Sequence, residues 1–92
     1  MLTHPAPGEV YHVTLTASAK KDLAALDTTT RRRVTQKLVT LATMPRSPDT
    51  LKLTNENRYR TRIGNYRILY TIDDTTRTVT VTNIKHRREA YR

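Results

Sequence analysis

The stretch that decides the fold is RYRTRIGNYRILYTID, residues 58–73. Two runs of β-forming residues, 58–63 and 66–73, alternate in character on either side of the pair Gly64-Asn65. A Gly-Asn pair suits a two-residue hairpin loop, so the stretch predicts two antiparallel strands. The segments LKL at 51–53 and RTVTVTNI at 77–84 also repeat with a period of two. Four consecutive strands are therefore expected from residue 51 onward.

Before these strands, the apolar residues recur at the spacing of an α-helix. A helix over about 17–26, capped by Thr16 or Ser18, places Ala19, Leu23 and Leu26 in one stripe. Asp27 and the three threonines after it form a polar break with capping chemistry, at which a second helix over about 28–43 begins, and Pro45 and Pro48 end this helix. A short strand over about 9–15 precedes both helices.

This element order predicts an α+β fold. It has an N-terminal strand, an antiparallel helical hairpin, and then a four-stranded, mostly antiparallel sheet that the helices cover on one face. The 92 residues fit one domain, expected over 9–92. Residues 1–8 carry two prolines and a glycine, and they are expected to form a flexible leader.

Composition limits the partners and the chemistry. Seventeen Lys and Arg against eight Asp and Glu give a net charge of +9, which predicts a polyanionic partner: nucleic acid, an acidic protein or an anionic membrane surface. No apolar run is long enough to span a bilayer and no secretory signal is visible, so a cytoplasmic location is expected. Zero cysteines and three scattered histidines predict no metal site and no cofactor.

The arginines of the predicted hairpin are the first candidate for chemistry. Strand alternation places Arg58, Arg60 and Arg62 on one face, and Arg67 of the next strand is expected to share it. Neighbouring like charges do not stabilise a sheet, whereas the planar guanidinium binds phosphate with two hydrogen bonds. The pattern therefore favours a phosphate site, with the solvated face of an ordinary basic domain as the alternative.

The basic C-terminal segment IKHRREAYR, residues 84–92, follows directly from the last predicted strand. Such a segment is either a disordered arm or a part of the same site. Together, YRTRIGNYRILYTID and IKHRREAYR resemble the C-terminal half of the RelE/ParE toxin superfamily, in which a basic strand leads through a Gly-x-Tyr-Arg turn to a terminal His-Arg-Arg-x-x-Tyr-like element. LTASAKKDLAAL and the proline-ended second helix resemble its N-terminal half, so the resemblance covers about residues 10–92.

The resemblance implies a toxin of a type II toxin–antitoxin system, closer to RelE, which cleaves mRNA on the ribosome and inhibits translation. The implied partners are a cognate antitoxin, mRNA and the ribosome, with no membrane and no small-molecule cofactor. Carried over position by position, the RelE working groups fall on Arg60, Arg62, Arg67, Arg87 and Tyr91. The two strand positions are lysine in the RelE pattern, and arginine there is limited to electrostatic and positioning roles because it does not lose its proton. Further RNA contacts are expected from Lys52, Arg58, Lys85 and Arg88.

The expected reaction is metal-free attack of the RNA 2'-OH on the adjacent phosphate. Tyr91 is the candidate base, and Arg87 would orient the leaving group or substitute weakly for an acid. His86 is either an alternative acid or base or a packing residue, because an extended segment points it away from Arg87. Two other functions stay open: a ParE-like, non-enzymatic inhibitor of DNA gyrase, and a plain nucleic-acid-binding module.

Overall fold

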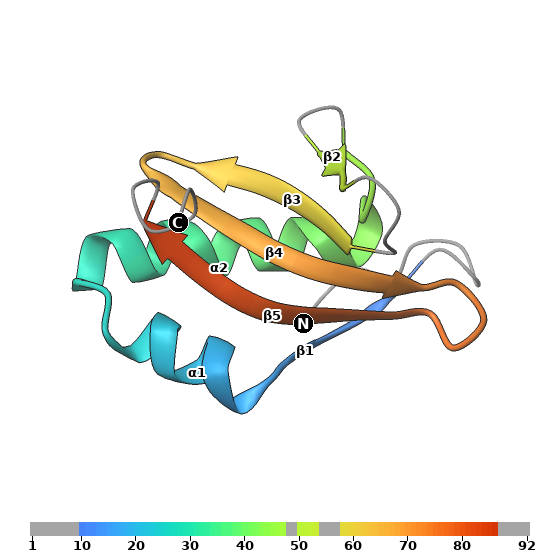
Figure 1. The fold of residues 1–92 in the computed structure, drawn as a ribbon, viewed down its shortest axis with the longest axis horizontal. Helices are drawn as coiled ribbons and strands as arrows, with labels where there is room; N and C mark the ends of the chain where they lie inside the picture. Colours follow the sequence, from blue (N-terminus) through green and yellow to red (C-terminus); the bar gives the residue numbers. More distant parts are fainter. Residues whose placement is uncertain (1–9, 48–49, 54–57, 87–92) are drawn as a thin grey trace.

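The structure is a computed structural model that describes residues 10–47, 50–53 and 58–86. The predicted leader, residues 1–8, lies outside the described residues. Two helices and five strands follow one another along the chain (Figure 1): β1 His12–Leu15, α1 Ala17–Ala24, α2 Thr28–Thr43, β2 Leu51–Lys52, β3 Arg58–Ile63, β4 Tyr66–Asp73 and β5 Thr78–His86. The predicted α+β class and element order are confirmed. The largest difference at the boundaries is the start of β1, three residues inside the predicted one. In addition, α1 ends two residues before its predicted end, and β5 ends two residues beyond its predicted end.

The hairpin of β3 and β4 forms over the predicted residues. Gly64 has a φ of +58°, and Asn65, the second loop residue, has a negative φ. A positive φ at the first loop position alone defines a type II′ turn, whose twist matches that of the two flanking strands. The loop therefore fixes the register in which Arg62 faces Arg67 and Ile63 faces Tyr66.

The N-terminal strand completes a mixed five-stranded sheet in the order β1-β5-β4-β3-β2. β1 pairs in parallel with β5, and the other neighbours pair antiparallel. β4 lies in the middle of the sheet, and β1 and β2 form its two edges (Figure 1). The strand with the Gly-x-Tyr-Arg motif is thus the central one.

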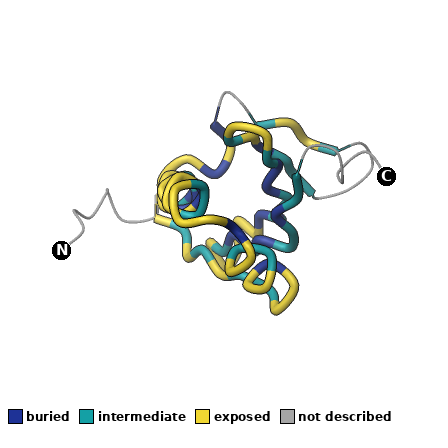
Figure 2. The backbone as a smooth tube through the Cα atoms, turned by 90° about the vertical axis from the view of Figure 1, so that its left-hand side faces the viewer, coloured by how far each residue is buried: buried dark blue, intermediate teal, exposed yellow. Residues whose placement is uncertain are grey.

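Side-chain caps begin both helices. The Thr16 hydroxyl accepts a hydrogen bond from the Ala19 amide at 3.1 Å, and the Asp27 carboxylate accepts one from the Thr30 amide at 3.2 Å. Hydrogen bonds from the side chain and then the backbone of Thr30 lower the pKa of Asp27. The core lies between the helices and one face of the sheet, and in Figure 2 buried segments of the sheet lie across from α2. Its buried apolar residues are Ala19, Leu26, Val34, Leu38, Leu41, Ile68, Tyr70, Ile72, Val79, Val81 and Ile84.

A β-bulge divides β5 into two parts. Leu69 faces Asn83 and Tyr70 faces Val81, so Thr82 is the extra residue, and its hydroxyl donates to the Leu69 carbonyl at 3.2 Å. The inward positions consequently shift from Val79 and Val81 to Ile84. Beyond the bulge, Lys85 lies on the face opposite the core. No helix among residues 10–47, 50–53 and 58–86 is long and apolar enough to cross a membrane.

Candidate RNA-binding face

The sheet face opposite the core, here called the open face, carries a row of cations across three strands. Arg62 of β3 faces Arg67 of β4, and Arg67 faces Lys85 of β5. Directly opposed residues project from the same side of a sheet, so these three side chains share the open face. Arg62, Arg67 and Lys85 are called the cationic row below.

Arg67 corrects one part of the sequence interpretation. Its position on the face of Arg62 agrees with the predicted alternation, but only 4% of the residue is exposed, whereas the predicted open face implied an exposed guanidinium. Part of the reason is its place in the central strand, because β3 and β5 cover both flanks of β4. Arg62 lies one strand nearer the edge and is exposed.

Lys85 is held by a residue that sequence reasoning missed. Its Nζ lies 3.5 Å from Oδ1 of Asp22, and the other Asp22 oxygen accepts a hydrogen bond from the Ile84 amide at 2.9 Å. β1 ends at Leu15, opposite Val81, so the end of β5 has no neighbouring strand on that side. Asp22 of α1 supplies the acceptor there, and it holds the Lys85 ammonium at the end of the cationic row nearer α1. Asp22 and Lys85 are 63 residues apart in the sequence, so no local pattern predicts that they pair.

Arg60 and Arg58 extend the positive charge along β3. Arg60 faces Leu69 and Arg58 faces Thr71, so both side chains belong to the open face. Among the described residues, neither Arg60 nor Arg62 has a hydrogen-bond or ion-pair partner. Both guanidinium groups are therefore available to a phosphate. Lys52 is exposed, but it faces Tyr59, whose alternation places it on the other side of the sheet from the arginines.

His86 lies on the face opposite the cationic row. It faces Tyr66, and the two rings meet edge to face with centroids 5.2 Å apart. Of its two expected roles, this geometry favours packing over proton transfer at the phosphate. The other C-terminal candidates, Arg87, Arg88 and Tyr91, lie outside the described residues.

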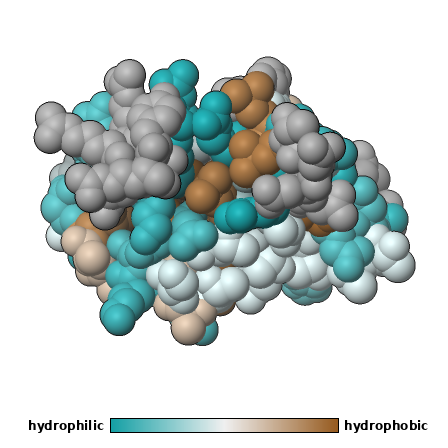
Figure 3. Space-filling model, in the orientation of Figure 1, coloured by the Kyte–Doolittle hydropathy of each residue, from teal (hydrophilic) through white to brown (hydrophobic). Residues whose placement is uncertain are grey.

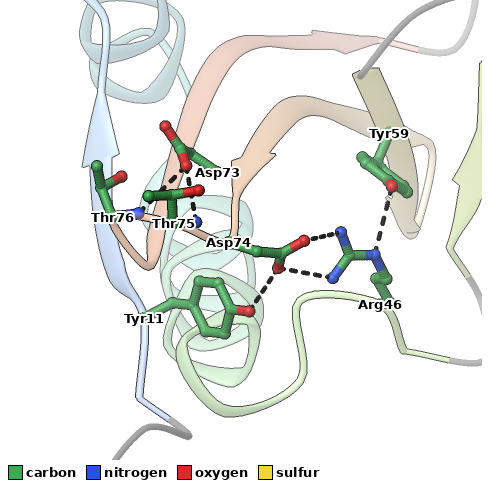
Figure 4. Close-up of polar contacts among 7 residues, drawn as sticks. All are labelled: Tyr11, Arg46, Tyr59, Asp73, Asp74, Thr75 and Thr76. Atoms are coloured by element: carbon green, nitrogen blue, oxygen red, sulfur yellow. Dashed lines mark hydrogen bonds and ion pairs between the residues drawn. The ribbon is translucent and has the colours of Figure 1, made fainter.

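A polar cluster that the sequence did not predict joins four segments at the far end of the sheet (Figure 4). Arg46 donates to both carboxylate oxygens of Asp74, at 3.1 and 2.9 Å, and its Nε donates to the Tyr59 hydroxyl at 3.3 Å. The Tyr11 hydroxyl donates to Asp74 at 2.6 Å. The Tyr59 ring stacks on Tyr70, whose buried hydroxyl donates to the Pro45 carbonyl at 2.7 Å. The cluster fixes the chain between α2 and β2 against β1 and the β4–β5 turn.

Charge pairing in this cluster shifts two pKa values. Hydrogen bonds from Arg46, and then from Tyr11, lower the pKa of Asp74 to about 2, and the bond to Asp74 raises the pKa of Arg46. Both side chains remain about half exposed, at 46% and 58%, so the surrounding water screens the pair. We assign the pair a positioning role in the fold and no part in catalysis.

Two hollows also lie among the described residues. A polar cleft of about 670 Å³ borders Arg46, Lys52 and Asp74, and an apolar groove of about 400 Å³ lies between β1 and α2. Within the described part of the chain, no three His, Asp or Glu side chains gather in a way that could hold a metal ion. The open face is therefore the strongest candidate site.

The chain is similar in sequence and in fold to known toxins. The sequence model of the family described as ParE toxin of type II toxin-antitoxin system, parDE, matches residues 13–91. The toxin–antitoxin complex RelBE2 from Mycobacterium tuberculosis contains a chain 31% identical to this one, with a TM-score of 0.77 over 85% of this chain and 99% of that chain. The archaeal RelE–RelB complex from Pyrococcus horikoshii contains one 26% identical, with a TM-score of 0.74 over 85% of this chain and 96% of that chain.

The isolated RelE toxin of E. coli is 23% identical, with a TM-score of 0.74 over 83% of each chain, which shows a shared fold. A comparison with curated proteins finds no match. The match by sequence is thus to a ParE model, whereas these three structures are of RelE toxins or their complexes.

Proposed function

Because the chain belongs to the RelE/ParE superfamily of type II toxins, and is closer to RelE, we propose that it is a ribosome-dependent endoribonuclease that cleaves mRNA. The observation that carries this proposal is the cationic row, with Arg60 beside it on the same face. Arg60 and Arg62 have no hydrogen-bond or ion-pair partner among the described residues, so both guanidinium groups can bind the phosphates of an RNA strand. The proposed place of action is the cytoplasm, where the ribosomes are.

The proposed reaction is attack of a ribose 2'-oxygen on the adjacent phosphorus. A bond from the 2'-oxygen to phosphorus forms, the bond to the 5'-oxygen breaks, and the products are a 2',3'-cyclic phosphate and a 5'-hydroxyl. Arg62 and Arg67 would stabilise the negative charge on the phosphorane, and Arg60 would hold the RNA backbone. A base takes the 2'-OH proton and an acid supplies one to the leaving oxygen.

Proton transfer is assigned by resemblance, because arginine serves poorly as acid or base. Tyr91 is the proposed base, and Arg87 would orient the leaving group or substitute weakly for an acid. Because these residues are weak acids and bases at neutral pH, the site depends on precise positioning of the substrate. Presentation of mRNA by the ribosome supplies that positioning, and orientation alone lowers such barriers by about 7–11 kcal/mol.

A cognate antitoxin is the proposed protein partner. The relatives from M. tuberculosis and P. horikoshii were both solved in complex with an antitoxin. The net charge of +9 favours a partner that is acidic in part. Addition of that antitoxin is expected to stop cleavage, and a small open reading frame beside the gene is the place to look for it.

Inhibition of DNA gyrase is the second candidate function, because the family model that matches is that of ParE toxins. Primer extension on mRNA in a translation reaction with purified ribosomes separates the two. New 5' ends are expected with the wild type and with Arg32→Ala, an exposed arginine on α2, and a strong reduction with Arg62→Ala. Intact mRNA together with damaged DNA would instead identify a gyrase inhibitor.

A further inference from the structure

An apolar pair lies beside the cationic row on the open face. Leu51 of β2 faces Arg60 of β3, and Arg60 faces Leu69 of β4, so the arginine stands between two leucines in one row across the sheet. Leu51 is 54% exposed and Leu69 is partly exposed. Figure 3 shows hydrophobic surface over β2 and the middle of the sheet, next to hydrophilic surface.

Neither leucine contributes to the hydrophobic core. The core cluster and the partly buried residues packed against it include neither Leu51 nor Leu69, and the core lies on the other face of the sheet. Single apolar residues are common on protein surfaces. Leu51 and Leu69, however, lie on either side of Arg60 and next to the cationic row. Folding alone does not require apolar and cationic side chains to lie side by side on this surface.

The separation of Arg60 from Arg62 fits the repeat of an RNA strand bound at the cationic row. Arg60 and Arg62 are two residues apart on β3, which corresponds to about 6.8 Å along a strand. That repeat is comparable with the separation of successive phosphates in an extended single strand of RNA. With the reacting phosphate at Arg62 and Arg67, the neighbouring phosphate reaches Arg60, and its nucleotide lies over the leucines.

We propose that Leu51 and Leu69, with Arg60 between them, form a binding site for one nucleobase of the RNA, next to the phosphate to be cleaved. The inference rests on the proposed function, because it takes the open face as the RNA-binding face. Unpaired bases bind proteins through apolar contacts with their faces, and here Arg60 would hold the phosphate of the same nucleotide. The two leucines supply such contacts without reading base edges, so any base is accepted and purines, with the larger face, bind more tightly.

Binding of a short RNA oligonucleotide tests the base site separately from cleavage. Fluorescence anisotropy at low salt compares one oligonucleotide with a version of the same length in which every nucleotide is abasic. Wild type is expected to bind the RNA with bases more tightly. Leu51→Ser with Leu69→Ser should weaken that binding by about fivefold, because the contact of a base with the leucine surface is lost. Binding of the abasic strand should be unchanged.

Matched controls separate a local effect from loss of structure. Val39 on α2 is 56% exposed, so Val39→Ser removes a similar apolar surface elsewhere and should alter neither affinity. Circular dichroism checks that each variant is folded. If Leu69→Ser does not fold, Leu51→Ser alone carries the test, because that residue is more than half exposed.

The base site and the nuclease function fail in different ways. New 5' ends in the ribosome assay, together with equal binding of both RNAs by the wild type, would overturn the base site alone. Equal loss of affinity for both RNAs in the leucine variants would also overturn it. No new 5' ends, together with a base-specific loss in those variants, would overturn the nuclease function and support the base site. Absence of binding to either RNA would overturn both the base site and the RNA-binding face.

Discussion

Arg62 and Arg67 face each other directly across the β3–β4 hairpin, yet Arg62 is exposed and only 4% of Arg67 is exposed. Lys85 faces Arg67 from the other side, although Asp22 compensates part of its charge. Arg62 has no hydrogen-bond or ion-pair partner among the described residues, and its charge stands directly opposite that of Arg67. An anion bound at Arg62 should therefore stabilise the protein more than the general effect of salt explains.

Inorganic phosphate should raise the melting temperature above its value in chloride of equal ionic strength. At ten times the dissociation constant, one bound anion adds about 1.4 kcal/mol to the free energy of unfolding. Thermal unfolding of the wild type, Arg62→Ala and Arg32→Ala tests whether the phosphate binds at the cationic row. The increase should be lost only in Arg62→Ala. An increase of equal size in all three proteins would place the anion away from the cationic row.

Thr61→Val should stabilise the protein. Thr61 faces Ile68 on the inner side of the sheet, it is fully buried, and its hydroxyl has no hydrogen-bond partner. Valine keeps the shape and removes the unpaired polar group, so the free energy of unfolding should rise by about 1 kcal/mol. For a domain of this size that corresponds to roughly 4–8 °C in Tm, measured by calorimetry. A lower Tm would show that the hydroxyl does have a partner in solution.

Gly64→Ala should destabilise the hairpin by about 1–2 kcal/mol, because an L side chain is strained in the left-handed region. Gly64 has a φ of +58°, and an added Cβ would also lie 3.4 Å from Nη1 of Arg33. Asn65→Ala is the matched control, since the second loop residue has a negative φ. Urea unfolding of the two variants compares them. Equal losses at both positions would argue against the type II′ turn.

The strands and the shared face of the hairpin arginines could be predicted from local pattern. Apart from Thr61 and Leu69, polar and apolar residues alternate through 58–73 about a Gly-Asn loop, so register and face follow from period and turn type. The sheet order could not be predicted in this way. The pairing of His12 with Thr78 joins residues 66 positions apart, and no local signal specifies it.

Two features of the site depend on tertiary contacts. The spacing of Val79, Val81 and Ile84 is the one trace of the bulge in the sequence, and only pairing with β4 identifies Thr82 as the extra residue. The burial of Arg67 likewise depends on its neighbours and not on its own strand. The catalytic roles given to the arginines, to His86 and to Tyr91 stay predictions that variants must test.

Protonation of Asp74 should weaken the protein in acid. Its pKa of about 2 in the folded state lies below the usual 3.8, so the pairing stabilises the fold above about pH 4 and this contribution is lost as pH falls towards 2. Arg46→Met should return the pKa of Asp74 towards its usual value, because Arg46 is the main cause of the shift. Carbon-13 NMR titration of the carboxylate measures it. A pKa still near 2 in Arg46→Met would assign the shift to Tyr11 instead.

Asp22→Ala should loosen the end of β5 without disturbing its first half. The Ile84 amide, in a residue only 3% exposed, would lose its acceptor, and Lys85 would lose its charge partner. An unpaired buried donor costs about 1–3 kcal/mol. Hydrogen exchange at the Ile84 amide should accelerate in Asp22→Ala and much less in Asp22→Asn, which keeps an acceptor oxygen. The Val79 amide, ahead of the bulge, is the internal reference. Unchanged exchange at Ile84 in Asp22→Ala would mean that another group accepts this bond, and that Asp22 of α1 does not hold the end of β5 through the Ile84 amide.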